Sequence, residues 1–151
     1  MSIQTEIQVG QDAPDFKLQA YPNGEYSLGQ FKGKKNVILA FYPKDDTPGC
    51  TTENCAFRDD SALFESAQTQ LFGVSCDDVN SHEAFSKKFS FKHPLLADVG
   101  GKVASKYGVY QEAKGYSSRK LFLIDKSGKI RKIVDGIPTN SELLDFIKNL
   151  K

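Results

Sequence analysis

The segment from Asn36 to Cys55 carries the features that predict the fold, and it reads NVILAFYPKDDTPGCTTENC. Its first part, residues 36–42, is a nearly continuous apolar run, which is typical of a strand covered on both faces of a sheet. A loop rich in proline, aspartate and glycine follows, and a helical pattern begins at Cys50. We therefore expect Cys50 in the first turn of a helix that directly follows a buried strand.

The periodicity of apolar residues elsewhere predicts an alternation of strands and helices. Strands are expected at residues 16–19, 26–28, 70–75, 95–97, 121–124 and 129–134, and helices at 50–68, 81–89, 102–107 and 140–150. The turn signal Pro22-Asn23-Gly24 joins the first two strands. Successive β–α–β units require parallel pairing, and a late hairpin requires an antiparallel edge. The order therefore predicts a thioredoxin-like α/β fold, with a central mixed β-sheet flanked by helices and an N-terminal β-hairpin.

Length and charge restrict the class of protein. Residues 1–151 are expected to form a single thioredoxin-like domain, since a domain commonly has about 100–200 residues. Lys and Arg number 20 and Asp and Glu number 19, which argues against a nucleic-acid-binding surface. The apolar run Val37–Phe41 is too short to span a membrane. Residues 1–6 lack the basic and apolar parts of a signal peptide, so a cytoplasmic location is expected.

The sequence contains three cysteines, Cys50, Cys55 and Cys76, and three is a poor number for a framework of structural disulfides. In a reducing compartment such cysteines are buried thiols, metal ligands or catalytic groups. A zinc site built with His82 and His93 is not expected, because neither cysteine nor histidine pairs have ligand spacing. We expect no metal and no other cofactor, and we interpret Cys76 as a bystander.

The expected position of Cys50 favours a reactive sulfur. Unpaired N–H groups and the positive end of the helix dipole lie in the first turn, and both stabilise a thiolate, which is the nucleophilic form. Thr47 stands three residues upstream, where its hydroxyl could accept from the thiol or donate to an oxygen of a bound substrate. Pro43 and Pro48 restrict the intervening loop. On these grounds alone, a reactive thiolate and an inert buried thiol both remain open.

The spacing Pro43-x-x-x-Thr47-x-x-Cys50 resembles the active-site motif of the peroxiredoxins, most closely the bacterioferritin-comigratory-protein / peroxiredoxin Q group. The similarity covers nearly the whole chain. Its further parts are Gly10-x-x-Ala13-Pro14-x-Phe16, Phe41-Tyr42, Cys55-Ala56-Phe57-Arg58-Asp59, Gly73-Val74-Ser75, Ser81-His82-x-x-Phe85 and Arg119-x-x-Phe122-Leu123-Ile124-Asp125. The resemblance implies a thiol-dependent peroxidase that reduces hydrogen peroxide and organic hydroperoxides.

The resemblance also implies a role for each residue of the motif. Cys50 matches the peroxidatic cysteine, whose thiolate attacks the peroxide and becomes a sulfenic acid. Arg119 is implied to stabilise that thiolate and to polarise the peroxide. Substrate binding is assigned in the same way to Pro43, Thr47 and Arg119. Two neighbours are implied to orient this set, Glu53 and Arg58.

Cys55 is implied to be the resolving cysteine, which forms an intramolecular disulfide with Cys50 that a thioredoxin or a glutaredoxin-like protein reduces. Such a cycle needs no second subunit, so a monomer is expected. On one intact helix the two Cα atoms would be about 8.6 Å apart, because five residues give roughly 7.5 Å of rise and about 140° of turn. A disulfide needs less than about 7 Å. We therefore expect the helix to unwind locally before the bond forms.

Two other functions remain open on the residues alone. A protein thiol–disulfide oxidoreductase of this fold would normally carry C-x-x-C, whereas four residues separate Cys50 from Cys55. Insulin reduction without peroxide consumption would favour it. A non-catalytic holdase or binding module would use exposed aromatic side chains such as Tyr107, Tyr110 and Tyr116, and peroxide-independent suppression of client aggregation would favour it.

Overall fold

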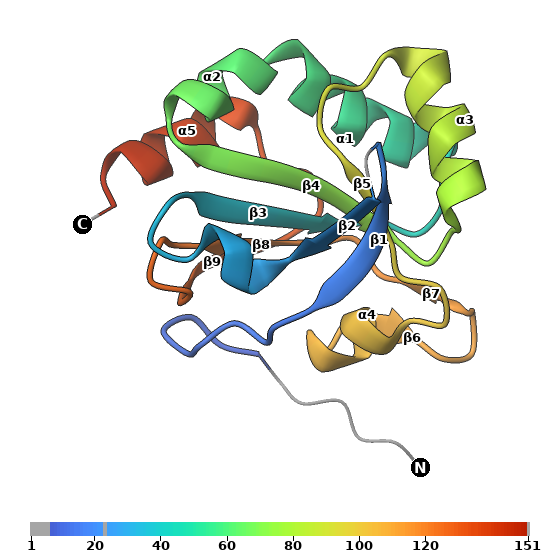
Figure 1. Cartoon of the computed structure of the whole chain (residues 1–151), viewed down its shortest axis with the longest axis horizontal. Coiled ribbons are helices and arrows are strands. Elements are labelled where there is room, and N and C mark those ends of the chain that lie inside the picture. Colours follow the sequence, from blue (N-terminus) through green and yellow to red (C-terminus); the bar gives the residue numbers. More distant parts are fainter. Residues whose placement is uncertain (1–6, 23, 151) are drawn as a thin grey trace.

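The computed structural model describes residues 7–22 and 24–150, and a seven-stranded sheet lies at its centre (Figure 1). In spatial order the strands are β2 (Gly24–Ser27), β1 (Lys17–Tyr21), β5 (Leu95–Ala97), β4 (Thr69–Ser75), β3 (Asn36–Phe41), β8 (Lys120–Ile124) and β9 (Ile130–Asp135). β3, β4 and β5 pair in parallel, whereas β8 is antiparallel to β3 and β9 is antiparallel to β8. The predicted mixed sheet and N-terminal hairpin are confirmed. Asn23 of the predicted turn, and residues 1–6, lie outside the described residues.

Helices cover both faces of the sheet. One face carries α1 (Pro48–Asp59), α2 (Ser61–Ser66), α3 (Val79–Phe89) and α5 (Asn140–Lys148), and the other carries α4 (Lys102–Lys106) and the 3-10 helix η1 (Leu28–Phe31) (Figure 1). A short ribbon of β6 (Tyr110–Gln111) and β7 (Tyr116–Ser117) follows α4 and was not predicted. Within the described part of the chain, no helix is long and apolar enough to cross a membrane.

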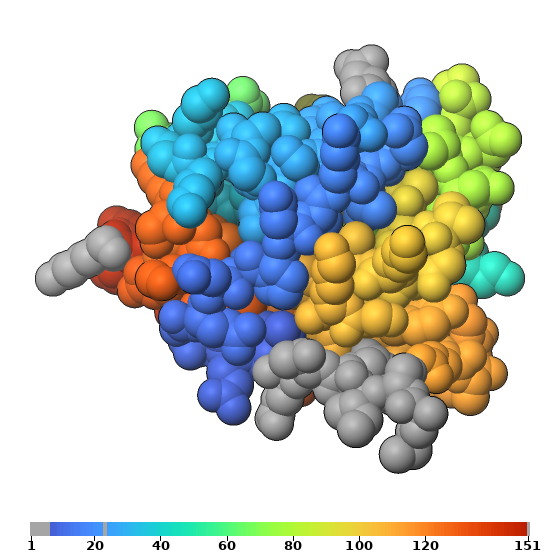
Figure 2. All heavy atoms as spheres, turned by 60° about the horizontal axis from the view of Figure 1, so that its bottom comes forward, coloured from blue at the N-terminus to red at the C-terminus, as the bar shows by residue number. Residues whose placement is uncertain are grey.

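On the second face, the segment before β1 lies against the α4 region. Figure 2 shows residues 7–16 beside this region. The hydroxyl of Tyr107 donates to the carbonyl of Pro14 at 2.6 Å and ties the two together. Tyr107 is only 1% exposed. Its predicted exposure is therefore wrong. The other two aromatic side chains of the holdase interpretation, Tyr110 and Tyr116, are half-buried rather than exposed.

β3 is buried on both faces, as its apolar run predicts. Ile38 and Ala40 belong to the core beneath α1, α2 and α5. Val37, Leu39 and Phe41 belong to the core on the α4 side. Burial of a large apolar side chain contributes roughly 1.5–3 kcal/mol. This strand therefore anchors the segment that leads into α1.

The single helix predicted over residues 50–68 is wrong, because the chain turns at Asp60 and forms α1 and α2 separately. The side-chain amide of Asn140 donates to the carbonyl of Ala56 at 2.8 Å and to the carboxylate of Asp60 at 2.9 Å. The turn lets Phe64 pack against Phe57, with ring centroids 6.0 Å apart. The break is thus accompanied by a contact with Asn140 of α5, which local periodicity cannot reveal.

The ends of β3, β4 and β5 and the start of β8 lie at the same edge of the sheet. Because β3, β4 and β5 are parallel, the segments that follow them begin at the same edge, which is where α/β sheets commonly bind ligands. Antiparallel β8 starts at that edge, since Lys120 pairs with Phe41 in the register. Arg119, the residue before β8, is thereby placed beside the segment that leads from β3 into α1.

Candidate active site

Cys50 lies in the first turn of α1. Thr47 is the N-cap, with extended backbone angles (φ −105°, ψ 154°), and Pro48 is the first helical residue. Proline suits that position because its missing N–H would have no helical acceptor there. Cys50 is fully buried, and all three cysteines are free thiols. The predicted placement of this cysteine, at the start of a helix after a buried strand, matches the structure.

The guanidinium of Arg119 lies between a sulfur and a carboxylate. Its Nη2 donates to Cys50 Sγ at 3.0 Å, and its Nη1 donates to Glu53 Oε1 at 2.9 Å. Gly49 makes this approach possible, because a Cβ at that position would lie 2.9 Å from Nη2 of Arg119. The arginine side chain keeps 21% of its surface exposed. A permanent cation with fixed donors thus reaches the buried sulfur from the solvent side.

Glu53 supports Arg119 from the interior. Its side chain is 2% exposed, and its Oε2 has no hydrogen-bond partner among residues 7–22 and 24–150. Burial raises the pKa of Glu53 to about 7, although the charge of Arg119 and their hydrogen bond act in the opposite direction. The carboxyl therefore changes charge near neutral pH, and its hydrogen bond with Arg119 is stronger when it is ionised.

Thr47 and Pro43 belong to the loop that precedes α1, and both are half-buried. The hydroxyl of Thr47 donates to the carbonyl of Lys44 at 2.9 Å. The hydroxyl proton is engaged by that carbonyl, and the oxygen keeps lone pairs that can accept a hydrogen bond. The expected actions of this hydroxyl toward the thiol and toward a substrate stay predictions.

A buried polar cluster fixes the same loop. Asp45 accepts from the hydroxyl of Tyr42 at 2.6 Å and from that of Ser81 at 2.8 Å, and its Oδ2 lies 2.7 Å from His82 Nδ1. The other ring nitrogen, Nε2, donates to the carbonyl of Leu96 at 2.8 Å, because a carbonyl can only accept. The cluster links the end of β3, the loop, α3 and β5. Sequence reasoning missed Asp45, although its partners Ser81 and His82 lie within a matched motif.

Cys55 and Arg58 lie further along α1. Cys55 is half-buried and packs against a cluster that contains Cys50 together with aromatic residues such as Phe85 and Phe91. Arg58 donates to the carbonyl of Phe89 at 2.7 Å and to the carboxylate of Asp59. The hydrogen bond to Asp59 and, to a smaller extent, the charge of Cys55 raise the pKa of Arg58. Arg58 therefore neighbours Cys55, whereas Glu53 directly contacts the Cys50–Arg119 pair.

Cys76 differs from Cys50 in its electrostatic surroundings. Burial and, after it, the charge of Asp98 raise the pKa of Cys76 to about 11. The thiol is therefore protonated at neutral pH and is a poor nucleophile. Within the described residues, no group of three or more histidine, cysteine, aspartate or glutamate side chains is arranged to hold a metal ion.

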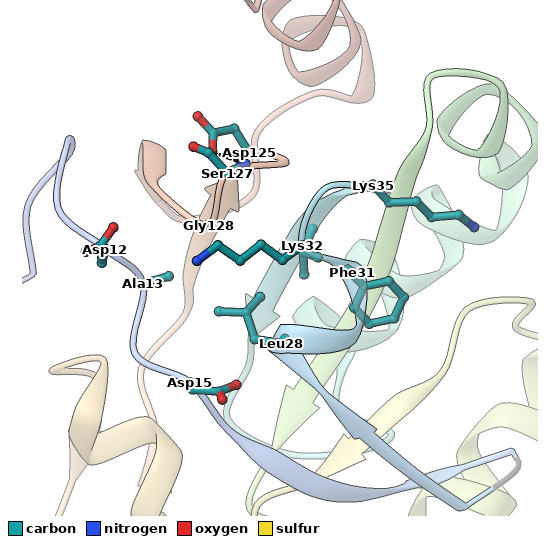
Figure 3. A pocket seen from close by; sticks show the side chains of 12 residues that line it. Asp12, Ala13, Asp15, Leu28, Phe31, Lys32, Lys35, Asp125, Ser127 and Gly128 are labelled. Carbon is teal, nitrogen blue, oxygen red and sulfur yellow. Dashed lines mark hydrogen bonds between the residues drawn. The ribbon is translucent and has the colours of Figure 1, made fainter.

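A separate hollow lies at the opposite end of the sheet. It has a volume of about 270 Å³ and is lined by residues that include Leu28, Phe31, Val37 and Asp125. Figure 3 shows the side chain of Lys32 extending across it. Val37 lies near the start of β3, whereas Cys50 follows the end of that strand. The hollow is therefore distinct from the Cys50 site.

The fold and the site together define a thioredoxin-like protein with a buried, arginine-bonded cysteine at a helix start. Residues 9–133 match the AhpC/TSA family, and the chain belongs to this family. Peroxiredoxin Q, chloroplastic, from Gentiana triflora is 38% identical over 134 residues, which cover 88% of this chain and 61% of that protein. A putative peroxiredoxin bcp from Coxiella burnetii is 37% identical over 150 residues, which cover 95% of this chain and 99% of that protein. The resemblance to this group is confirmed.

Solved structures agree with the fold. Peroxidoxin BcpB from Mycobacterium tuberculosis superposes with a TM-score of 0.88 at 27% identity, covering 97% of this chain and 99% of that one. The reduced 2-Cys peroxiredoxin from Plasmodium vivax superposes with a TM-score of 0.85 at 32% identity, covering 93% and 80%. The thioredoxin-like fold is therefore shared with known peroxiredoxins.

The first prediction concerns Glu53, whose pKa is about 7 in the folded protein against an ordinary value of 4.5. The folded state binds this proton more tightly than the unfolded state. The resulting stabilisation is fully present below pH 4.5, the ordinary pKa of this group, and is lost as the pH rises to its pKa of about 7 in the folded protein. Glu53→Gln stays neutral, so its free energy of unfolding should rise relative to wild type by up to about 3 kcal/mol over that window.

Urea unfolding at a series of pH values measures this difference. Glu65→Gln is the control, because Glu65 lies exposed on α2 and should show no comparable trend. A difference between Glu53→Gln and wild type that stays constant across the window would contradict the prediction.

Proposed function

We propose that this protein is a thiol-dependent peroxidase that reduces hydrogen peroxide and organic hydroperoxides with Cys50 as its nucleophile. The observation that carries the proposal is the 3.0 Å contact between Arg119 Nη2 and Cys50 Sγ at the start of α1. A permanent cation at this distance favours the thiolate, as does the helix start. The chain spans 61% of the peroxiredoxin Q from Gentiana triflora, and its activity and substrates are therefore proposed from its own site.

The first step is a two-electron transfer from sulfur to peroxide. The Cys50 thiolate attacks the terminal oxygen of the peroxide, so that an S–O bond forms and the O–O bond breaks. The leaving oxygen takes up a proton and departs as water or an alcohol. Arg119 stabilises the charge that passes to that oxygen. Thr47, whose own proton is engaged by Lys44, accepts from the peroxide O–H group, and Pro43 limits the loop around it.

The second step joins the two cysteines of α1. The Cys55 thiol attacks the Cys50 sulfenic acid, an S–S bond forms, and water leaves. Both cysteines lie within the one helix α1. About 8.6 Å would separate their Cα atoms in ideal helical geometry, which exceeds the reach of a disulfide. The first turns of α1 therefore open before the bond closes.

The cycle ends with an external reductant, for which a thioredoxin or a glutaredoxin-like protein is the proposed partner. An intramolecular disulfide requires no partner subunit, so a monomer is sufficient. Return of both cysteines to thiols requires a reducing compartment. The expected cytoplasm meets that requirement. The names of the plant relatives place those proteins in the chloroplast.

Substitution of single cysteines tests whether Cys50 is the nucleophile. Cys50→Ser should abolish peroxide turnover, because a serine hydroxyl is not ionised at neutral pH and has no equivalent of the sulfenic acid. Cys76→Ser is the matched control and should leave turnover nearly intact, since Cys76 is held as a thiol. Anaerobic thiol titration before and after one equivalent of peroxide gives the measurement, with two thiols lost in wild type. Wild-type turnover by Cys50→Ser would rule out this assignment.

Removal of the cation tests the role of Arg119. Arg119→Ala should slow the first oxidation by about 10²–10³, the usual effect of losing one donor to a developing negative charge. Arg131→Ala is the control, because Arg131 also pairs with a carboxylate, that of Asp125, away from Cys50. Rapid-quench measurement of the second-order rate with peroxide distinguishes the two. An unchanged rate in Arg119→Ala would contradict the role.

Redox-dependent opening of α1 tests the resolving step. Peptide mapping of the oxidised protein should find Cys50 linked to Cys55 within one chain. Hydrogen exchange in residues 48–62 should be faster after oxidation, because broken helical hydrogen bonds lose their protection. Strand β8 should stay protected in both states. A main disulfide between chains or to Cys76, or equal protection of α1 in both states, would contradict this account.

A further inference from the structure

Behind Cys50, a buried amide connects α1 to a histidine. Asn54 is fully buried. Its Nδ2 donates to the carbonyl of Cys50 at 2.9 Å, and its Oδ1 lies 2.8 Å from His93 Nε2. An amide oxygen only accepts, so His93 donates from Nε2. Its Nδ1 has no hydrogen-bond partner in the described part of the chain.

His93 is the partner of Asn54 on the side of the protein core. It lies in the segment between α3 and β5, and its ring packs edge-on against Phe57 with centroids 5.7 Å apart. Asn54 itself sits directly against β4, since a Cβ at Gly73 would lie 2.8 Å from its Oδ1. The two hydrogen bonds therefore attach the Cys50 turn of α1 to the core.

We infer that Asn54 and His93 are positioning residues for the resolving step, which hold the Cys50 turn closed and set how readily it opens. The inference rests on the proposed peroxidase cycle and extends it. Asn54 lies between Cys50 and Cys55 in the sequence, so the turn cannot unwind without moving its amide. Both hydrogen bonds must break when that happens.

Opening decides which of two reactions consumes the Cys50 sulfenic acid. In the first, the Cys55 thiol attacks it, an S–S bond forms and water leaves. In the second, a further peroxide oxidises it, so that an S–O bond forms, an O–O bond breaks and water or an alcohol leaves; the product is a sulfinic acid. A closed turn keeps Cys55 away and favours the second reaction. The Asn54–His93 link thus sets the ratio of sulfinic acid to disulfide.

The link also makes opening sensitive to acid. Burial lowers the pKa of His93 to about 3, with no contribution from a neighbouring charge. Release of Asn54 gives water access to His93, and its pKa returns toward about 6.5. At His93 the open form then binds more protons than the closed form, so the contribution of His93 makes opening easier as the pH falls below that value. Glu53 on the same turn contributes in the opposite direction and is the same in wild type and in the His93 variant. The charged groups that line the hollow beside His93 are Lys35, Glu65 and Lys92, and all three stay unchanged in the variants below.

The first test compares wild type with Asn54→Ala after a pulse of excess hydrogen peroxide without reductant. Mass spectrometry gives the ratio of sulfinic acid to disulfide, and rapid quenching gives the rate of the first oxidation. One net hydrogen bond shifts an equilibrium by about two- to tenfold. The ratio should fall by about that factor while the first oxidation keeps its rate. Asn36→Ala is the control and should leave the ratio unchanged, because Asn36 is another buried asparagine, bonded to Thr69 at the far end of β3.

The second test uses His93→Phe, which keeps a ring beside Phe57 and removes the titrating group. When the pH is lowered from about 7.5 to about 5.5, the ratio of sulfinic acid to disulfide should fall about tenfold more in wild type than in His93→Phe. This is the shift expected one pH unit below about 6.5, the pKa of His93 in the open form. Asn54→Ala should show a weaker acid response than wild type, because it lacks the amide whose release exposes His93. At the higher pH, His93→Phe should also have a lower ratio than wild type, because the Asn54 amide oxygen loses its donor.

Each result decides the inference. A ratio in Asn54→Ala equal to that of wild type overturns the role of Asn54, and an identical acid response in wild type and His93→Phe overturns that of His93. Where Asn54→Ala does not fold, an unchanged ratio in His93→Phe at the higher pH overturns the link. Wild-type protein in which peroxide leaves Cys50 unoxidised would refute the peroxidase function itself, and the inference with it.

Discussion

The guanidinium of Arg119, held between Cys50 Sγ and Glu53 Oε1, is the interaction on which the rest of the site depends. A buried sulfur that is to carry charge needs a compensating cation, because the protein interior solvates an isolated charge poorly. Burial acts on Glu53 in the same way and holds its pKa near neutrality. The absence of a side chain at Gly49 leaves the space in which the cation lies.

The same helix faces opposite demands in the proposed cycle. Peroxide reduction requires a folded first turn, which keeps the sulfur beside Arg119 and below the loop fixed by Asp45. Disulfide formation requires that turn to open. A helix end suits both demands, because terminal turns open at a low free energy while the sheet stays intact. The polar contacts on the inner side of α1, in addition to its apolar packing, then set the equilibrium between the folded and the open state of this turn.

Local patterns predict some parts of this structure and not others, for physical reasons. The run that forms β3 is predictable because a strand buried on both faces is almost entirely apolar. The helical pattern that begins at Cys50 predicts the start of α1 to within two residues of its observed start at Pro48. The break at Asp60 is not predictable, since the amide that accompanies it belongs to Asn140, 80 residues away. Spacing alone does not bring Arg119 to Cys50, and only the family resemblance suggested it. The doublet Asp45-Asp46 likewise gives no indication that the first is buried and the second exposed.

The antiparallel register of β8 has a consequence for the newly synthesised chain. Cys50 and Arg119 are 69 residues apart, and the strand that precedes Cys50 pairs with the strand that follows Arg119. A nascent chain that has left the ribosome only as far as β5 already contains the sulfur, but it lacks the cation. The arginine contact therefore forms only when β8 has been made and has docked on β3. Formation of this contact is in this way tied to completion of the sheet, and in an unfinished chain Cys50 lacks the cation that it contacts in the folded protein.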